Sequence, residues 1–130
     1  MISELKETLG PLLPLKINRA DSRYGELTFG GEGWTFGSPS AWRVVKDGVL
    51  VIGWSMVWRE EDTPERVAEL AGLSIVAVAP QSPRMGGDPA FELSDGSWVE
   101  IFSDHPIDPW AMDLPGLVYV GAPFDPRYVS

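Results

Sequence analysis

Short runs of alternating apolar and polar residues follow one another along the chain, and glycine-containing turns separate them. Four of these turns lie between apolar runs, at residues 30–33, 46–48, 94–97 and 114–116. Glycine accepts the positive φ that tight turns require, and Asp-Gly and Pro-Gly are strong turn signals. Apolar runs on both sides of such a turn indicate an antiparallel hairpin, so we expect four hairpins.

Two segments have the apolar spacing and the end signals of short helices. Residues 3–9 begin at Ser3, which can cap a helix, and are followed by Gly-Pro. Residues 64–71 follow Thr63, begin with proline and end before glycine. We therefore expect one helix near the start of the chain and a second near its middle.

A longer motif occurs twice. Five residues separate Trp42 from Gly48, and five separate Trp110 from Gly116; four apolar residues and a closing glycine follow each time. A repeat of this length indicates two copies of one supersecondary unit. When the two halves of the chain are aligned on this motif, their helices, their hairpins and the glycines between them also coincide.

The expected fold is therefore α+β and mainly antiparallel β, in one domain spanning residues 1–130. It contains an internal duplication of a helix plus a four-to-five-strand unit, at about residues 1–60 and 61–130. Each unit alone would expose an apolar sheet face, so the two are expected to pack on each other around the tryptophans. A sandwich and a partly closed barrel both satisfy the pattern.

Three segments differ between the two halves: residues 54–62, residues 80–89 and residues 103–109. The first is expected to continue the preceding strand, and the second to form a long glycine-rich loop. The third contains four extra residues in the second half. Function is most often found where otherwise matching repeats differ, so the candidate partner-binding residues come from these segments.

In an extended chain, Trp54, Met56 and Trp58 would lie on one face. The favoured interpretation is that they cover the core beneath the second helix. If part of this group is exposed, it becomes the best candidate for a dimer or partner surface, because Trp and Met are favoured at such surfaces. Arg59 follows directly and belongs to the same candidate surface.

The other two segments add Arg84, Met85, Asp104, His105 and Asp108 as candidate partner-binding residues. The only histidine of the chain lies among aspartates here, which raises the alternative of a metal site. The spacing matches no known ligand motif, and aspartates near proline are usually turn formers. We therefore predict no metal, no cofactor and no catalytic residue.

The net charge of the chain favours some classes of partner and disfavours others. The chain has 10 basic and 19 acidic residues, which gives a net charge of −9. Such a field repels nucleic acids and anionic membranes but favours association with a basic protein. A simpler interpretation is that the acidity only keeps the protein soluble. The chain lacks cysteine, signal-peptide features and long apolar runs, so a cytoplasmic location is expected.

Three functional hypotheses remain open, and catalytic signals are weak. The first is a non-enzymatic binding protein, and the third is self-association through residues 54–58. The second is a small-ligand-binding protein or enzyme with a pocket between the repeats, containing Arg43, His105 or an acidic residue. There is no Gly-x-Ser-x-Gly motif and no phosphate-binding signature.

Residues 41–43 followed by Gly48, and residues 93–97 followed by residues 101–104 and Trp110, form a pattern that resembles a known group. It is similar to small uncharacterised bacterial proteins in domain-of-unknown-function families, some of which are thought to be immunity proteins of toxin systems. The resemblance covers about the second two-thirds of the chain. It implies a protein-interaction partner and assigns no residue a role.

Overall fold

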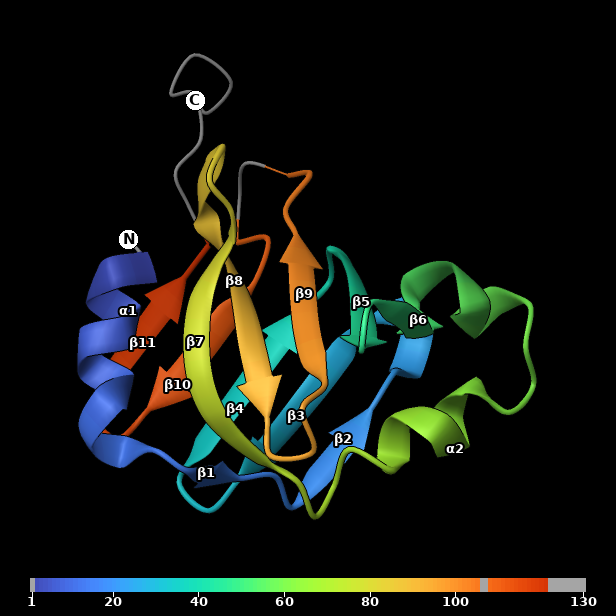
Figure 1. The fold of residues 1–130 in the computed structure, drawn as a ribbon, viewed down its shortest axis with the longest axis horizontal. Helices are drawn as coiled ribbons and strands as arrows, with labels where there is room; N and C mark the ends of the chain where they lie inside the picture. Colours follow the sequence, from blue (N-terminus) through green and yellow to red (C-terminus); the bar gives the residue numbers. More distant parts are fainter. Residues whose placement is uncertain (1, 106–107, 122–130) are drawn as a thin grey trace.

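The computed structural model describes residues 2–105 and 108–121 as two antiparallel sheets that lie face to face (Figure 1). The sheets stay separate and form a sandwich-like arrangement, not a closed barrel. The six-stranded sheet has the order β1 (Leu15–Lys16), β7 (Ser74–Ser82), β8 (Met85–Leu93), β9 (Trp98–Phe102), β5 (Ala41–Lys46), β6 (Val49–Gly53). The five-stranded sheet has the order β11 (Leu117–Val120), β10 (Ala111–Leu114), β4 (Trp34–Ser38), β3 (Leu27–Gly31), β2 (Arg19–Asp21).

Both expected helices are confirmed, and they lie at opposite sides of the sandwich (Figure 1). The helix α1 (Ile2–Leu9) packs against β7, and α2 (Thr63–Ala68) packs against β2. Three short 3₁₀ helices join the strands: η1 (Gly10–Leu12), η2 (Arg23–Gly25) and η3 (Trp54–Trp58). Within the described part of the chain, no helix has the length and apolar character needed to cross a membrane.

The four predicted hairpins are also confirmed. They are β3–β4, β5–β6, β8–β9 and β10–β11, and each closes at one of the predicted turns. Gly48 and Gly116 both adopt a φ of +75° in their turns, which explains why glycine occupies these positions. Turn chemistry alone was therefore sufficient to locate these four strand pairs.

A cluster of aromatic rings lies in the core between the sheets, among a larger number of aliphatic side chains. Phe36 stacks on Phe29 at a centroid distance of 5.0 Å and on Trp110 at 5.9 Å. Phe91, from the opposite sheet, contacts both phenylalanines edge-on. These rings are almost completely buried, so they provide the apolar burial that holds the two sheets together.

The two sheets are built by exchange of strands between the first and second parts of the chain. The β3–β4 hairpin pairs with β10, and the β8–β9 hairpin pairs with β5. In the first ladder Phe36 faces Met112, and in the second Val99 faces Val44; all four are buried. The α1 and α2 helices follow the same rule, because each packs on a strand from the other part.

Two buried tryptophans, Trp42 in β5 and Trp110 just before β10, each donate a hydrogen bond to a glycine carbonyl. The indole N–H of Trp42 donates to the carbonyl of Gly25 at 3.0 Å, and that of Trp110 donates to the carbonyl of Gly87 at 2.9 Å. Each bond satisfies a buried polar group and ties the tryptophan strand to a neighbouring hairpin. These are the two tryptophans of the repeated sequence motif.

The expectation that residues 54–58 continue the preceding strand is wrong. Backbone pairing ends at Gly53, and the next five residues form η3. The side-chain sulfur of Met56 accepts from the Gly53 N–H, and its carbonyl accepts from the N–H groups of Arg59 and Glu60. Met56 thus satisfies backbone N–H groups at both ends of η3. The alternation of apolar residues in this segment did not indicate a turn.

The expected loop at residues 80–89 is also wrong, because this segment is the end of the β7–β8 hairpin. Only Pro83 and Arg84 form the turn. Pro80 faces Pro89 across the hairpin, so the two residues that lack an N–H occupy the same rung. The prolines and glycines that suggested a loop are accommodated within a long, irregular hairpin.

Candidate functional site

The turn η3 presents an exposed aromatic surface at the edge of the six-stranded sheet. The side chains of Trp54 and Trp58 are 39% and 61% exposed, whereas Met56 is half-buried. The two indoles contact each other edge-on, with their centroids 6.5 Å apart. The interpretation that these residues cover the core is therefore wrong for both tryptophans.

The positions of the two indoles are fixed from beneath by a glycine. A β-carbon on Gly25 would lie 2.8 Å from Cζ2 of Trp58 and 3.2 Å from Nε1 of Trp54. The absence of a side chain thus allows both rings to pack on the backbone of η2. The preceding Tyr24 is 85% exposed and has a φ of 57°, an unusual conformation for a bulky residue.

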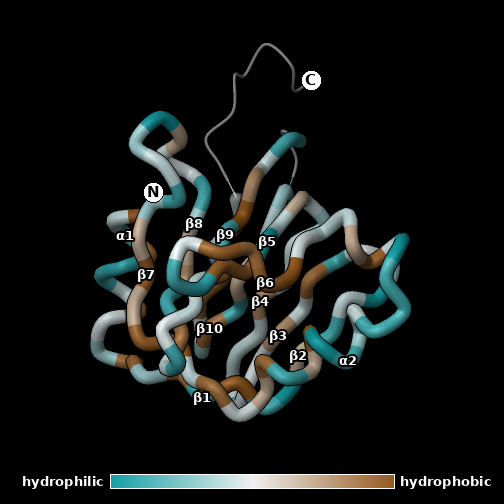
Figure 2. The backbone as a smooth tube through the Cα atoms, turned by 45° about the vertical axis from the view of Figure 1, so that its right-hand side comes forward, coloured by the Kyte–Doolittle hydropathy of each residue, from teal (hydrophilic) through white to brown (hydrophobic). Residues whose placement is uncertain are grey.

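Acidic residues border this surface. Glu60, Glu61 and Asp62 follow η3 directly and are exposed, and Arg59 is the one basic residue of that segment. Figure 2 shows this link to α2 as a hydrophilic segment. We call Trp54 and Trp58, together with these three acidic residues, the tryptophan surface.

A groove of about 620 Å³ adjoins the tryptophan surface. It lies over β5, β6 and β9, on the face of the six-stranded sheet that points away from the core, and Trp54 forms part of its wall. Arg43 donates from Nε to Oε1 of Glu100 at 2.7 Å, and its guanidinium carbon lies 5.0 Å from the centre of the Phe102 ring. A charged group and apolar surface thus meet in one groove.

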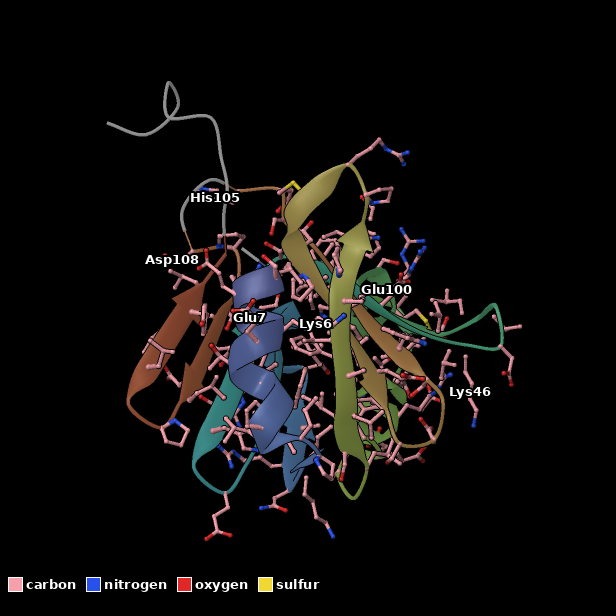
Figure 3. All side chains as sticks on the ribbon, turned by 60° about the vertical axis from the view of Figure 1, so that its left-hand side comes forward. Lys6, Glu7, Lys46, Glu100, His105 and Asp108 are labelled. Carbon is pink, nitrogen blue, oxygen red and sulfur yellow. The ribbon has the colours of Figure 1, made fainter. Side chains whose placement is uncertain are left out.

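The remaining predicted site residues lie elsewhere. Asp104, His105 and Asp108 line a second cavity of about 350 Å³, between the β4–β5 and β9–β10 connections. Figure 3 shows His105 and Asp108 on the opposite side of the view from Glu100. Part of the predicted 103–109 segment lies outside the described residues.

Arg84 and Met85 lie at the tip of the β7–β8 hairpin, so they belong to neither the tryptophan surface nor the second cavity. The nine predicted residues therefore do not form one site. Four of them, Trp54, Met56, Trp58 and Arg59, come together at η3.

A buried polar pair lies at the end of the β8–β9 ladder that is away from the turn. Oδ2 of Asp88 accepts from the backbone N–H of Ser103 at 2.9 Å. Its other carboxylate oxygen and the Ser103 hydroxyl are buried, and neither has a hydrogen-bond partner among the described residues.

Sequence reasoning missed Glu100, Phe102 and Leu50 as site residues. A signal was present for the first two, because Val99 and Ile101 are apolar and alternate with them, which predicts that Glu100 and Phe102 face away from the core. Their proximity to Arg43 depends on the pairing of β9 with β5, which no local pattern reveals.

No cluster of three or more potential metal-ligating side chains occurs within residues 2–105 and 108–121. Comparison with known proteins gives no further assignment, because no protein-family model, curated protein or solved structure matches this chain.

Proposed function

We propose that this protein is a non-enzymatic, cytoplasmic binding protein that recognises a basic protein through the tryptophan surface. The observation that carries the proposal is the exposure of Trp54 and Trp58 on a turn whose backbone is held by its own hydrogen bonds. Large aromatic side chains that lose little conformational freedom on binding are the residues that most often dominate binding energy at interfaces.

The charge of the surface supports a basic partner. Glu60, Glu61 and Asp62 lie next to the indoles, and the whole chain carries a net charge of −9. Opposite charges around an apolar centre accelerate association and disfavour partners of the wrong sign. The same charge opposes self-association through this surface, so we favour a different protein over a second copy of the chain.

We also propose that the framework arose by duplication and that the binding surface lies outside the duplicated part. The repeated sequence motif around Trp42 and Trp110 supports the duplication, as do the two tryptophan–glycine hydrogen bonds. The turn η3 follows β6, and residues 54–62 have no counterpart in the second half of the sequence. The resemblance to immunity proteins makes a basic toxin one partner of the required kind.

The test uses the immobilised protein and extract from its native host. We expect wild type to retain a basic protein that a Trp54→Ala, Trp58→Ala double variant does not retain. A matched control is Leu117→Ala, Val118→Ala, which removes exposed apolar side chains from β11, on the other sheet. Equal retention by all three proteins, or retention that survives loss of both tryptophans, would contradict the proposal.

A second candidate function is small-ligand binding, and the groove beside Trp54 is the observation that favours it. Its volume of about 620 Å³ is within the range of ligand sites. It lies on an outer face, whereas the space between the exchanged sheets is filled by buried rings. A ligand found between the sheets would therefore require the core to open.

A further inference from the structure

Arg43 is the one cationic side chain among the residues that line the groove. Oε1 of Glu100 accepts a hydrogen bond from its Nε, and its guanidinium carbon lies over the Phe102 ring, 5.0 Å from the centroid. Among the described residues, neither terminal nitrogen of Arg43 has a hydrogen-bond acceptor. The guanidinium is thus oriented but only partly used, and its two terminal nitrogens form the fork that recognises carboxylates.

Arg43 faces Glu100 one rung away from the buried Val44–Val99 pair in the β5–β9 ladder, so both side chains lie on the outer face of the six-stranded sheet. Arg43 is exposed and Glu100 is half-buried, and both line the groove. The ion pair is therefore accessible to a ligand that enters the groove.

The rest of the groove suits an apolar group. Leu50 and Trp54 are exposed and line it next to the Arg43–Phe102 stack. The lining comes from one sheet face and from η3, so the groove has a floor and one wall. A small molecule is usually enclosed on most of its surface, whereas one end of a polypeptide can lie along an open groove.

The net charge of the protein limits which kind of ligand could provide the carboxylate. A net charge of −9 disfavours a peptide rich in Asp or Glu. Every polypeptide with a free end carries a terminal carboxylate, and a basic protein carries one as well. A basic partner with an apolar last residue therefore satisfies both the acidic field and the Arg43 fork.

We infer that the groove binds the C-terminal residue of a polypeptide partner. The terminal carboxylate is held by Arg43, and the last side chain packs between Leu50 and Trp54. This inference rests on the proposed function, because it places the end of the same partner beside the tryptophan surface.

The probes are two fluorescein-labelled peptides of Gly, Ser and Lys that end in Leu, one with a free carboxylate and one with an amide. Fluorescence anisotropy measures their affinity for the full chain. We expect the free acid to bind at least about tenfold more tightly than the amide, the value of one charge-assisted contact. Equal affinity for the two peptides would overturn the inference.

Variants assign the effect to Arg43. Arg43→Gln should abolish the preference for the free acid, and Arg43→Lys should retain only part of it because it keeps the charge but loses the fork. The matched control is Arg19→Gln, which removes an exposed cation on β2 of the other sheet and should leave the preference intact. A preference that survives Arg43→Gln would also overturn the inference, and thermal melting verifies that each variant is folded.

Two further results separate this inference from its alternatives. If N-acetyl-leucine binds as tightly as the peptide, the ligand is a small acid and the C-terminal assignment is wrong. If a protein is captured through Trp58 while the peptides show no preference for the acid, the proposed function stands and this inference fails. If the free acid binds more tightly than the amide but no basic protein is captured, this inference stands and the proposed function fails.

Discussion

At the scale of single residues, polar contacts in the turns stabilise local geometry. Asp95, in the β8–β9 turn, accepts from the backbone N–H and the hydroxyl of Ser97 at 2.9 and 2.6 Å. Burial alone raises the pKa of Asp95, but these two hydrogen bonds and the more distant Lys46 outweigh it and bring the pKa below its usual 3.8. The folded state therefore favours the charged form of this carboxyl group.

This shift predicts a pH dependence of stability. Because the pKa of Asp95 is lower in the folded state, the unfolded chain binds more protons between the two pKa values, and stability rises with pH there. Asp95→Asn should lower the free energy of unfolding at neutral pH by at most about 1 kcal/mol. The difference from wild type should disappear as the pH falls through the folded-state pKa, as followed by urea unfolding.

Ser97→Ala and Lys46→Met provide the comparison for this prediction. The hydrogen bonds from Ser97 lower the pKa of Asp95 more than Lys46 does, so Ser97→Ala should remove more of the pH dependence. An Asp95→Asn effect of equal size at neutral and strongly acidic pH would show that the carboxylate charge is not involved.

At the scale of elements, the hairpins follow from local sequence and η3 does not. The Asp-Gly turn at residues 46–48 and the one at residues 94–97 need no information from distant parts of the chain. The η3 turn forms because Met56 satisfies nearby backbone groups and because Gly25, far away in sequence, leaves room for two indoles. Alternation of apolar residues predicted a strand there because it carries no information about either contact.

The β7–β8 hairpin illustrates the same limit. Its prolines and glycines are breaker signals locally, but Pro80 and Pro89 occupy one rung once the strands pair. The groove was equally beyond local reasoning. An outward orientation of Arg43 and Glu100 could be predicted from alternation, whereas their contact depends on strand exchange between the two halves.

The packing of η3 on Gly25 predicts a separation between stability and binding. Gly25 and Gly116 have φ values of +80° and +75°, so alanine at either position is expected to cost about 1 kcal/mol in backbone strain. Only Gly25→Ala also displaces the Trp58 and Trp54 rings, because no atom lies within 4 Å of a β-carbon on Gly116.

We therefore expect similar urea midpoints for Gly25→Ala and Gly116→Ala, with a loss of partner capture in the first variant alone. The exposed Trp58 ring can move away from the new methyl group, which keeps the additional cost in stability small. Normal capture by Gly25→Ala would show that the positions of the two indoles do not matter for binding.

At the scale of the whole molecule, the two halves of the chain depend on each other. Residues 1–60 lack β7, β8 and β9 of the six-stranded sheet, and residues 61–130 lack β2, β3 and β4 of the five-stranded sheet. Neither half therefore retains enough of the opposite sheet to cover its apolar face, and small sheets without such cover are marginally stable in water. We therefore expect the two halves to fold together.

This dependence predicts the behaviour of fragments. Residues 1–60 and residues 61–130, produced separately, should each be largely unfolded by circular dichroism and by amide chemical-shift dispersion. An equimolar mixture should recover native-like spectra, because the exchanged ladders can then form. A native-like spectrum from either fragment alone would contradict the strand exchange.

The central claim is that this protein binds a basic partner through the tryptophan surface, and site-specific photo-crosslinking tests it most directly. A photoreactive amino acid replaces either Trp58, on η3, or the exposed Val118, on β11 of the other sheet. In the native host we predict a cross-link to a basic protein from position 58 and none from position 118. A cross-link from position 118 alone, or no cross-link from position 58, would contradict the claim.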